Sequence, residues 1–356
     1  DNMVAELKVT DFLQHAIVIR TTGLTNYAFA PIADKLFKGK AKITYDAAAK
    51  MRDNDFWADH RTTKLTKSEA GMDSFIKNMS KTKHFKWIMF ASKALIENFV
   101  ETGSEKTPSK VDIGPVNTFI SKNFVDGIRL RASARTTAKF NPHWFFEGYY
   151  AYGTKSHRSY YDAKVTYSFN KPEYQPIEFP IRTLSFESNK DVESPSDKYL
   201  VHNKDNIFMT FRPVKVEKMS FINRQKLNFM WETDYGLATS VELRTESNVP
   251  TGKLIYEKMD GSLVDKVRMT ELIVGLDYRP GQSYVNSKQQ RMAVNLDAPE
   301  FKITHTMGIQ NFLGSDFNTN LTEVSVYKRF WLGSWGHVDT RLQAGAQWNK
   351  VPFPFL

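Results

Sequence analysis

Arginine residues recur at alternate positions of one short segment, GIRLRASAR at 127–135. Successive side chains of a β-strand point to opposite faces, so this spacing places the arginines on one face and apolar side chains on the other. Such a ladder would attract anions in a water-filled interior, or would pair with carboxylates of neighbouring strands. Of these two hypotheses, the paired network is favoured. The ladder consists of Arg129, Arg131 and Arg135, and its candidate partners are Glu147, Asp162, Asp277 and Asp339.

Residues that could perform catalysis are sparse. The chain has no G-x-S-x-G, phosphate-loop or H-E-x-x-H motif, no cysteine, and eight histidines without metal-ligand spacing. His157 near Ser159, and His305 between two threonines, are the local arrangements that could activate a hydroxyl group, as in a hydrolase. Each fits a polar position of a loop or strand better. We therefore predict that the protein is not an enzyme and binds no cofactor or metal.

The alternation of apolar and polar residues recurs at 161–169 and 338–348. We interpret the apolar face as facing lipid and the charged face as lining a wet interior, as in a transmembrane β-barrel. A soluble β-sandwich is the alternative, and it would bury the same apolar face in a core. The residues predicted to face lipid are Ile128, Leu130, Val165, Tyr167 and Leu342.

Aromatic residues make up 13% of the chain and gather near the ends of predicted strands. Indole and phenol rings favour the boundary between lipid headgroups and hydrocarbon, because one edge is apolar and the other forms hydrogen bonds. An aromatic-rich soluble core is the alternative interpretation. The predicted aromatic girdle comprises Trp144, Phe146, Tyr150, Tyr152, Phe330, Trp331 and Trp335.

The elements that must position these residues begin near residue 111, where the hydrophobic pattern takes a period of two. Short turns join neighbouring strands, which predicts an antiparallel up-and-down meander. The longer polar stretches at 188–203 and 281–290 are expected to be loops. Predicted strands are centred on 112–121, 126–137, 143–152, 158–169, 177–187, 219–233, 237–246, 267–279, 301–312, 320–332 and 336–348.

Residues 1–110 follow a different pattern, with an irregular opening and then two amphipathic helices. The first helix would begin at Thr66 or Ser68 and end near Met79, and the second would run from Thr82 to about Glu101. Burial of their apolar surface against a barrel rim or a plug is the favoured interpretation. The alternative is a membrane-surface helix flanked by lysines 81, 83, 86 and 93. We therefore divide the chain into a periplasmic segment, 1–110, and the first part of a barrel, 111–356.

The net charge of +10 is spread along the chain rather than gathered in a nucleic-acid-binding motif, which argues against a nucleic-acid partner. The mean hydropathy of −0.46 and the lack of a run of about 18 apolar residues argue against helical membrane spans. The first residues show no leader sequence, so we expect the chain to begin inside a mature protein.

Four segments together resemble a known family. These segments are RDNDFWADHRTTKLTKSEAGMDSF (52–75), VDIGPVNTFISKNFVDGIRLRASARTT (111–137), FFEGYYAYGTKSHRSYYDAKVTYSFN (145–170) and RLQAGAQWNKVPFPFL (341–356). They resemble the Bacteroidota outer-membrane family of unknown function that carries an N-terminal carboxypeptidase-regulatory-like domain and a C-terminal barrel. One departure is Ser133-Ala134, where the family pattern has a glycine pair.

This resemblance implies a longer protein, with the regulatory-like domain before Asp1 and further barrel strands after Leu356. It also implies a distant similarity to the surface-antigen superfamily, which includes outer-membrane insertases. The Arg-Gly-Phe-type lid-loop motif of those insertases does not occur in this sequence.

The sequence thus predicts a mainly β protein, an antiparallel transmembrane β-barrel of the bacterial outer membrane, of which this chain forms a part after a short periplasmic helical segment. Its expected role is non-enzymatic, in envelope biogenesis, protein assembly or transport. The expected partners are outer-membrane lipids and other outer-membrane or periplasmic proteins. The alternatives are a diffusive porin with a cationic lumen, an outer-membrane hydrolase and a soluble β-sandwich binding module.

Overall fold

The computed structural model describes most of the chain from residue 81 onward and a few shorter segments before it. The chain divides into two compact units, 1–88 and 89–356, and each is described by itself. The described residues are 2–9, 14–21, 56, 59, 60, 67, 71, 74, 75, 78, 79, 81–103, 107–195, 197, 204–207, 216–258, 260–352 and 355.

The first unit contains an antiparallel hairpin of β1 (Asn2–Val9) and β2 (Gln14–Thr21). The prediction of an irregular opening is therefore wrong for these residues. The two segments contain runs of apolar and β-branched residues, such as Ala16 to Ile19, which strands favour. The first predicted helix falls largely outside the described residues.

The second predicted helix is confirmed as α3 (Lys83–Glu97), which ends four residues earlier than expected. The helix stops because Asn98 takes a left-handed backbone conformation, with φ of 59°. The Asn98 side chain also donates to Asn117 Oδ1 at 3.0 Å and accepts from the Asn117 backbone N–H at 2.9 Å. The described helices include none that is long and apolar enough to cross a membrane.

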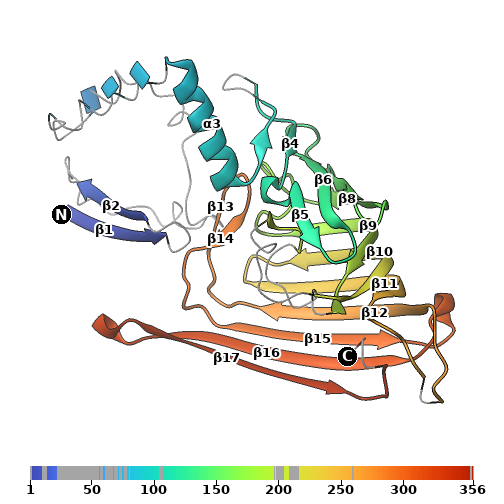
Figure 1. Ribbon diagram of the computed structural model, residues 1–356. Coiled ribbons are helices and arrows are strands. Elements are labelled where there is room, and N and C mark those ends of the chain that lie inside the picture. Colours follow the sequence, from blue (N-terminus) through green and yellow to red (C-terminus); the bar gives the residue numbers. More distant parts are fainter. Residues whose placement is uncertain are drawn as a thin grey trace. The chain divides into compact units, whose positions relative to one another are not determined.

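The second unit is built on one antiparallel sheet of thirteen strands (Figure 1). Sequential strands from β6 to β12 and from β15 to β17 pair with each other, which confirms the mainly β class and the predicted antiparallel meander. The strands are β3 (Val100–Glu101), β4 (Val111–Ile113), β5 (Ile120–Asn123), β6 (Gly127–Thr136), β7 (Trp144–Gly153), β8 (Ser159–Ser168), β9 (Arg182–Glu193), β10 (Lys218–Glu232), β11 (Leu237–Gly252), β12 (Val267–Tyr278), β15 (Glu300–Gly308), β16 (Thr319–Trp331) and β17 (His337–Gln347).

Several regions differ from the prediction. β9 begins five residues late, β11 continues six residues past its predicted end, and β15 ends four residues early. The strand predicted at 112–121 is broken into β4 and β5, because Pro115 cannot donate a ladder hydrogen bond and a short 3-10 turn follows it. The predicted loop at 188–203 is wrong for 188–193, which extend β9. The predicted loop at 281–290 contains β13 (Tyr284–Asn286), which pairs with β14 (Arg291–Ala293). The 3-10 turns are η3 (Val116–Thr118), η6 (Phe312–Gly314) and η7 (Gly333–Trp335).

The strand register gathers apolar side chains from every long strand onto one face of the sheet. Residues directly opposite each other in an antiparallel pair share a face. We call this the apolar face and the opposite side the polar face. One row of paired positions across seven strands holds Trp144, Tyr167, Leu184, Phe229, Val241, Val274 and His305, and a second row holds Tyr278, Phe301, Val326 and Leu342.

The apolar face is the exposed one. Ile128 is 52% exposed and Leu342 is 67% exposed, whereas Arg129 on the polar face is 0% exposed. The buried hydrophobic cluster is small and consists of Ala151, Tyr160, Val192 and Met219. Among the described residues, buried polar and charged residues outnumber buried hydrophobic ones, which inverts the ordinary distribution of a soluble domain.

Candidate functional site

The candidate site is a group of charged side chains on the polar face of β6 and β9, which we call the Arg129 cluster. It consists of Asp126, Arg129, Arg131, Asp191, Lys204 and Asp205. β6 is held on one side by β7 and on the other by β4 and β5, so its side chains have a fixed direction.

Arg129 is the centre of this cluster and contacts three carboxylates. Its guanidinium lies 3.3 Å from Asp126, 2.7 Å from Asp191 and 3.3 Å from Asp205. Moving an isolated charge from water to a protein interior is costly, so a fully buried arginine requires counter-charges of this kind. The partners come from the turn before β6, from β9 and from the loop after β9.

Two further cations complete the cluster. Arg131 lies 3.0 Å from Asp205, and Lys204 lies 2.9 Å from Asp191 and 3.7 Å from Asp205. Burial by itself would lower the pKa of Lys204, but the two carboxylates outweigh burial and raise this pKa above its usual value. With three cations and three carboxylates, the Arg129 cluster is neutral in sum.

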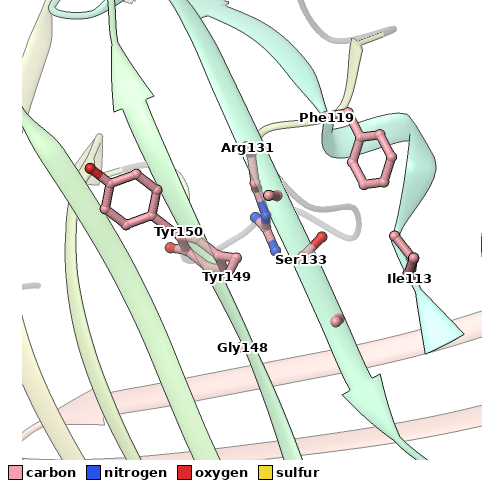
Figure 2. Close-up of a pocket in the computed structure, with 9 residues that line it drawn as sticks. Ile113, Phe119, Arg131, Ser133, Gly148, Tyr149 and Tyr150 are labelled. Atoms are coloured by element: carbon pink, nitrogen blue, oxygen red, sulfur yellow. The ribbon is translucent and has the colours of Figure 1, made fainter. Parts of the chain in front are cut away.

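Aromatic side chains support the cluster. The Tyr149 hydroxyl donates to Asp191, and the Arg131 guanidinium lies 3.6 Å from the centre of the Tyr149 ring. Tyr160 donates to Asp126 at 2.5 Å, and its ring lies 4.5 Å from the Arg129 guanidinium. Figure 2 shows the Arg131 side chain beside Tyr149, while Tyr150 of the same strand extends away from it. These contacts combine charge-assisted hydrogen bonds with cation–π contacts.

Arg135 lies apart from the cluster, so the predicted ladder is divided. Its guanidinium stacks 3.6 Å from the centre of the Phe99 ring and donates to Gln289. Glu147 lies directly opposite Arg135 in the register. The connection from β12 to β15 thereby reaches back to β6, and Lys288 beside Gln289 also bonds Glu101 of β3 at 2.8 Å.

The prediction that the ladder forms ion pairs with these four carboxylates is wrong. The spacing of a single strand reveals a cationic face but not which residues a folded sheet places opposite it. The four predicted carboxylates have other contacts: Glu147 with Lys164 at 3.6 Å, Asp162 with Asn189 at 2.9 Å, Asp277 with Arg279 at 2.8 Å, and Asp339 with Arg329 at 2.6 Å.

The six partners that sequence reasoning missed had weak signals. Asp126 belongs to the turn sequence NFVDG, where Asn123 accepts from the Asp126 backbone N–H at 2.7 Å, so a turn signal was present. Lys204 and Asp205 lie in a polar loop, and no local pattern indicates that this loop covers β6. The remaining missed partners are Tyr149, Tyr160 and Asp191.

Charge pairing continues across the polar face of later strands. Each pair joins neighbouring strands, so cations of one strand meet carboxylates of the next. The pairs are Lys226 with Glu187 at 2.9 Å, Arg224 with Glu193 at 3.0 Å and with Glu246, and Arg244 with Glu271 at 2.6 Å.

The two histidines bond other hydroxyl groups than the neighbours predicted from the sequence. His157 shares a hydrogen bond with Tyr152 at 3.1 Å, whereas Ser159 bonds Tyr150 at 2.7 Å. His305 bonds Thr322 at 2.9 Å on the apolar face. In the described part of the chain, no group of three or more His, Asp or Glu side chains has a metal-binding arrangement.

The residues predicted to face lipid or to form a girdle lie mostly at exposed positions. Val165 and Tyr167 are half-buried by their neighbours. Phe330 and Trp331 are adjacent on β16 and so point to opposite faces, and only Phe330 belongs to the apolar face. The exposed members are Ile128, Leu130, Leu342, Trp144, Phe146, Tyr150, Tyr152, Phe330, Trp331 and Trp335.

A shallow groove lies beside the cluster, where the chain leaves the edge of β6 between β4 and β5 (Figure 2). Its apolar lining includes Ala132, Ala134 and Gly148, with Ile113 and Phe119 on the side of β4 and η3. Ala134 is paired with Gly148 and Ile113 in the register, so this part of the groove belongs to the apolar face.

The fold and site together define a class: a mainly β protein whose long antiparallel strands expose apolar side chains and bury a paired charge network. Residues 214–355, less than half of the chain, match the model of a family of unknown function (DUF5686), C-terminal domain. The matched region contains β10 to β17. No curated protein matches the chain.

Proposed function

We propose that this chain forms part of the wall of a transmembrane β-barrel in a bacterial outer membrane, with its apolar face against lipid. The observation that carries the proposal is the inverted burial of the sheet. Large apolar side chains are exposed on strand after strand, while Arg129 and its carboxylates are buried. Full burial of one large apolar side chain contributes about 1.5–3 kcal/mol. Exposure to water of a whole face would therefore cost an amount comparable to the entire net stability of a domain, about 5–15 kcal/mol.

Hydrocarbon as the solvent for this face removes that cost. Backbone groups must then be paired within the sheet, and the continuous ladder from β6 to β17 supplies such pairing. The apolar face of β6 to β8 also carries aromatic side chains at both strand ends, and these include Trp144 and Tyr152. Such positions are expected where a barrel wall crosses the two membrane–water interfaces.

The proposed role is non-enzymatic, as a component of envelope biogenesis, protein assembly or transport that acts through its barrel and partner surfaces. The neutral Arg129 cluster supports this role over an anion-selective porin, since each cation of the cluster already has a carboxylate partner. The resemblance to the Bacteroidota family with a carboxypeptidase-regulatory-like domain adds the expectation that the segment before the sheet lies in the periplasm.

Labels at two adjacent positions of β17 test the membrane assignment. The protein has no cysteine, so Leu342→Cys and Gln343→Cys can each carry one environment-sensitive fluorophore. Both positions are exposed and they lie on opposite faces of the strand. In vesicles containing the full-length protein, we expect a lipid-attached quencher to quench the Leu342→Cys label at least threefold more strongly than the Gln343→Cys label.

Iodide in the aqueous phase should show the opposite preference, which provides the matched control. Equal quenching of both labels by iodide, or full-length protein that stays monodisperse in buffer without detergent, would refute the lipid-facing wall.

A further inference from the structure

Helix α3 exposes its apolar side. The favoured sequence-based interpretation, burial of this surface against a rim or plug, stays a prediction, since the described residues supply no such cover. Leu95 is 66% exposed and Ile96 is 81% exposed, whereas the small residue Ala94 is the one buried side chain of the helix. A helix with this much exposed apolar surface requires a cover that the described chain does not supply.

Two exposed apolar residues of α3 and two of its lysines occupy different sides. At about 100° per residue, residues seven apart fall almost in line. Ile88 therefore lies in line with Leu95, and Lys86 lies in line with Lys93 on the other side. Both lysines and both apolar residues are exposed, so the helix is amphipathic with its apolar side outward.

The N-terminal end of α3 carries an excess of positive charge. Lys81, Lys83 and Lys86 are exposed there, and the first turn contains no acidic residue. The N-terminus is the positive end of the helix dipole, so cations at this end are unfavourable unless an external anion lies nearby. Lys93 differs, because it lies 3.8 Å from Glu97 and 3.7 Å from Glu101. The charge pattern indicates an anionic surface at the N-terminal end.

The helix is also continuous with the proposed lipid-facing sheet. Its last residue, Glu97, is separated from β3 by residues 98 and 99 alone. Two residues extend the chain by at most about 7 Å, which holds the end of α3 close to the first strand of the sheet. With 15 residues, the helix is about 22 Å long, too short to cross a hydrocarbon core of about 30 Å.

We propose that α3 lies in the surface of an anionic lipid bilayer, with Ile88 and Leu95 at the hydrocarbon boundary. Lys81, Lys83 and Lys86 then meet lipid phosphate groups. This inference rests on the proposed function, because it assigns the helix to the same membrane as the sheet. Apolar burial and attraction to anionic headgroups are the two contributions that hold such helices at an interface.

The experiment places single labels on the two sides of α3 in the full-length protein, with any cysteine outside this chain replaced by serine. Leu95→Cys reports the apolar side, and Lys93→Cys is the matched control, two residues away and about 160° around the helix. In vesicles of phosphatidylcholine with phosphatidylglycerol, we expect a lipid-attached quencher to quench the Leu95→Cys label at least threefold more than the Lys93→Cys label. Replacement of Lys81, Lys83 and Lys86 by glutamine, or omission of phosphatidylglycerol, should reduce this difference at least twofold.

The outcomes separate this inference from the proposed function, because the Leu342→Cys label on β17 is measured in the same vesicles. A Leu95→Cys label that iodide quenches as strongly as the Lys93→Cys label overturns the inference. A label shielded from both quenchers overturns it as well, since it identifies a protein cover such as a second copy. If the lipid-attached quencher quenches the Leu342→Cys label but not the Leu95→Cys label, only the proposal of a surface helix is refuted. If it quenches neither label, the proposal of a lipid-facing wall is refuted.

Discussion

Arg129 shows at the scale of a single residue how this chain buries charge. Its side chain has no exposed surface, yet it lies among Asp126, Asp191 and Asp205, and the cations Arg131 and Lys204 restore neutrality. Coulombic attraction is strong where water is excluded, but so is the desolvation penalty. The cluster is therefore stable only as a complete set, and loss of one partner leaves a buried charge without compensation.

Asp191→Asn tests that dependence. Asp191 contacts both Arg129 and Lys204, so the substitution leaves two buried cations short of one negative charge. We expect the free energy of unfolding of the reconstituted protein to fall by about 3–5 kcal/mol, measured by thermal or denaturant unfolding. Asp339→Asn is the control, because Asp339 pairs with Arg329 at an exposed position and its loss should leave the unfolding midpoint unchanged. Equal effects of the two substitutions would contradict a special role for the Arg129 cluster.

At the scale of elements, close approach of β7 and β8 depends on a glycine. A Cβ atom added to Gly148 would lie 2.4 Å from the carbonyl oxygen of Asp162, so the two strands would have to shift. Gly148 lies opposite Ala163 on the apolar face, in the row of small residues that also contains Ala134. The spacing of β7 and β8 at this point thus depends on the absence of a side chain at Gly148.

Gly148→Ala is therefore expected to destabilise the protein by about 1–3 kcal/mol through displacement of the two strands. Ala163→Val, directly opposite on β8, is the matched control, because it adds apolar volume at an exposed position of the apolar face. The measurement is the unfolding midpoint of both variants in the same vesicles. A larger loss of stability for Ala163→Val than for Gly148→Ala would show that the apolar face is packed against protein rather than open.

At the scale of the whole molecule, the pairing of charges leads to a prediction about ion conductance. The arginine ladder by itself suggests anion selectivity, but Arg129 and Arg131 face carboxylates and Arg135 is covered by Phe99 and Gln289. The hairpin of β13 and β14 adds a further tie, since Arg291 lies 2.7 Å from Glu232 at the end of β10. Mobile anions would have to displace these internal partners.

We therefore expect the full-length protein to produce no steady conductance in planar lipid bilayers. A general porin recorded in the same bilayers verifies the sensitivity of the measurement. Stable, ohmic steps with preference for anions would favour the porin alternative and would contradict a role based on partner surfaces.

Much of the sheet could be predicted because alternation is a local property. The bounds of β6, β7, β8, β10, β12, β16 and β17 differ from the predicted ranges by at most two residues. Errors arose where a local pattern has two meanings, as at Pro115, which interrupts an apolar run, and at Ser188, where a polar stretch continues β9. Asn189, Asp191 and Glu193 fit a strand because they lie on the polar face, which is the buried one.

The sequence by itself determined the strands, their turns and the separation of apolar from charged residues, since these depend on neighbours within a few positions. Only the tertiary structure decided which carboxylates neutralise Arg129, because Asp191 and Asp205 lie more than sixty residues away along the chain and reach it through strand register and one loop. It likewise decided that the apolar face and the apolar side of α3 are exposed: a hydrophobic stripe specifies that a side avoids water, but not whether protein or another solvent covers it.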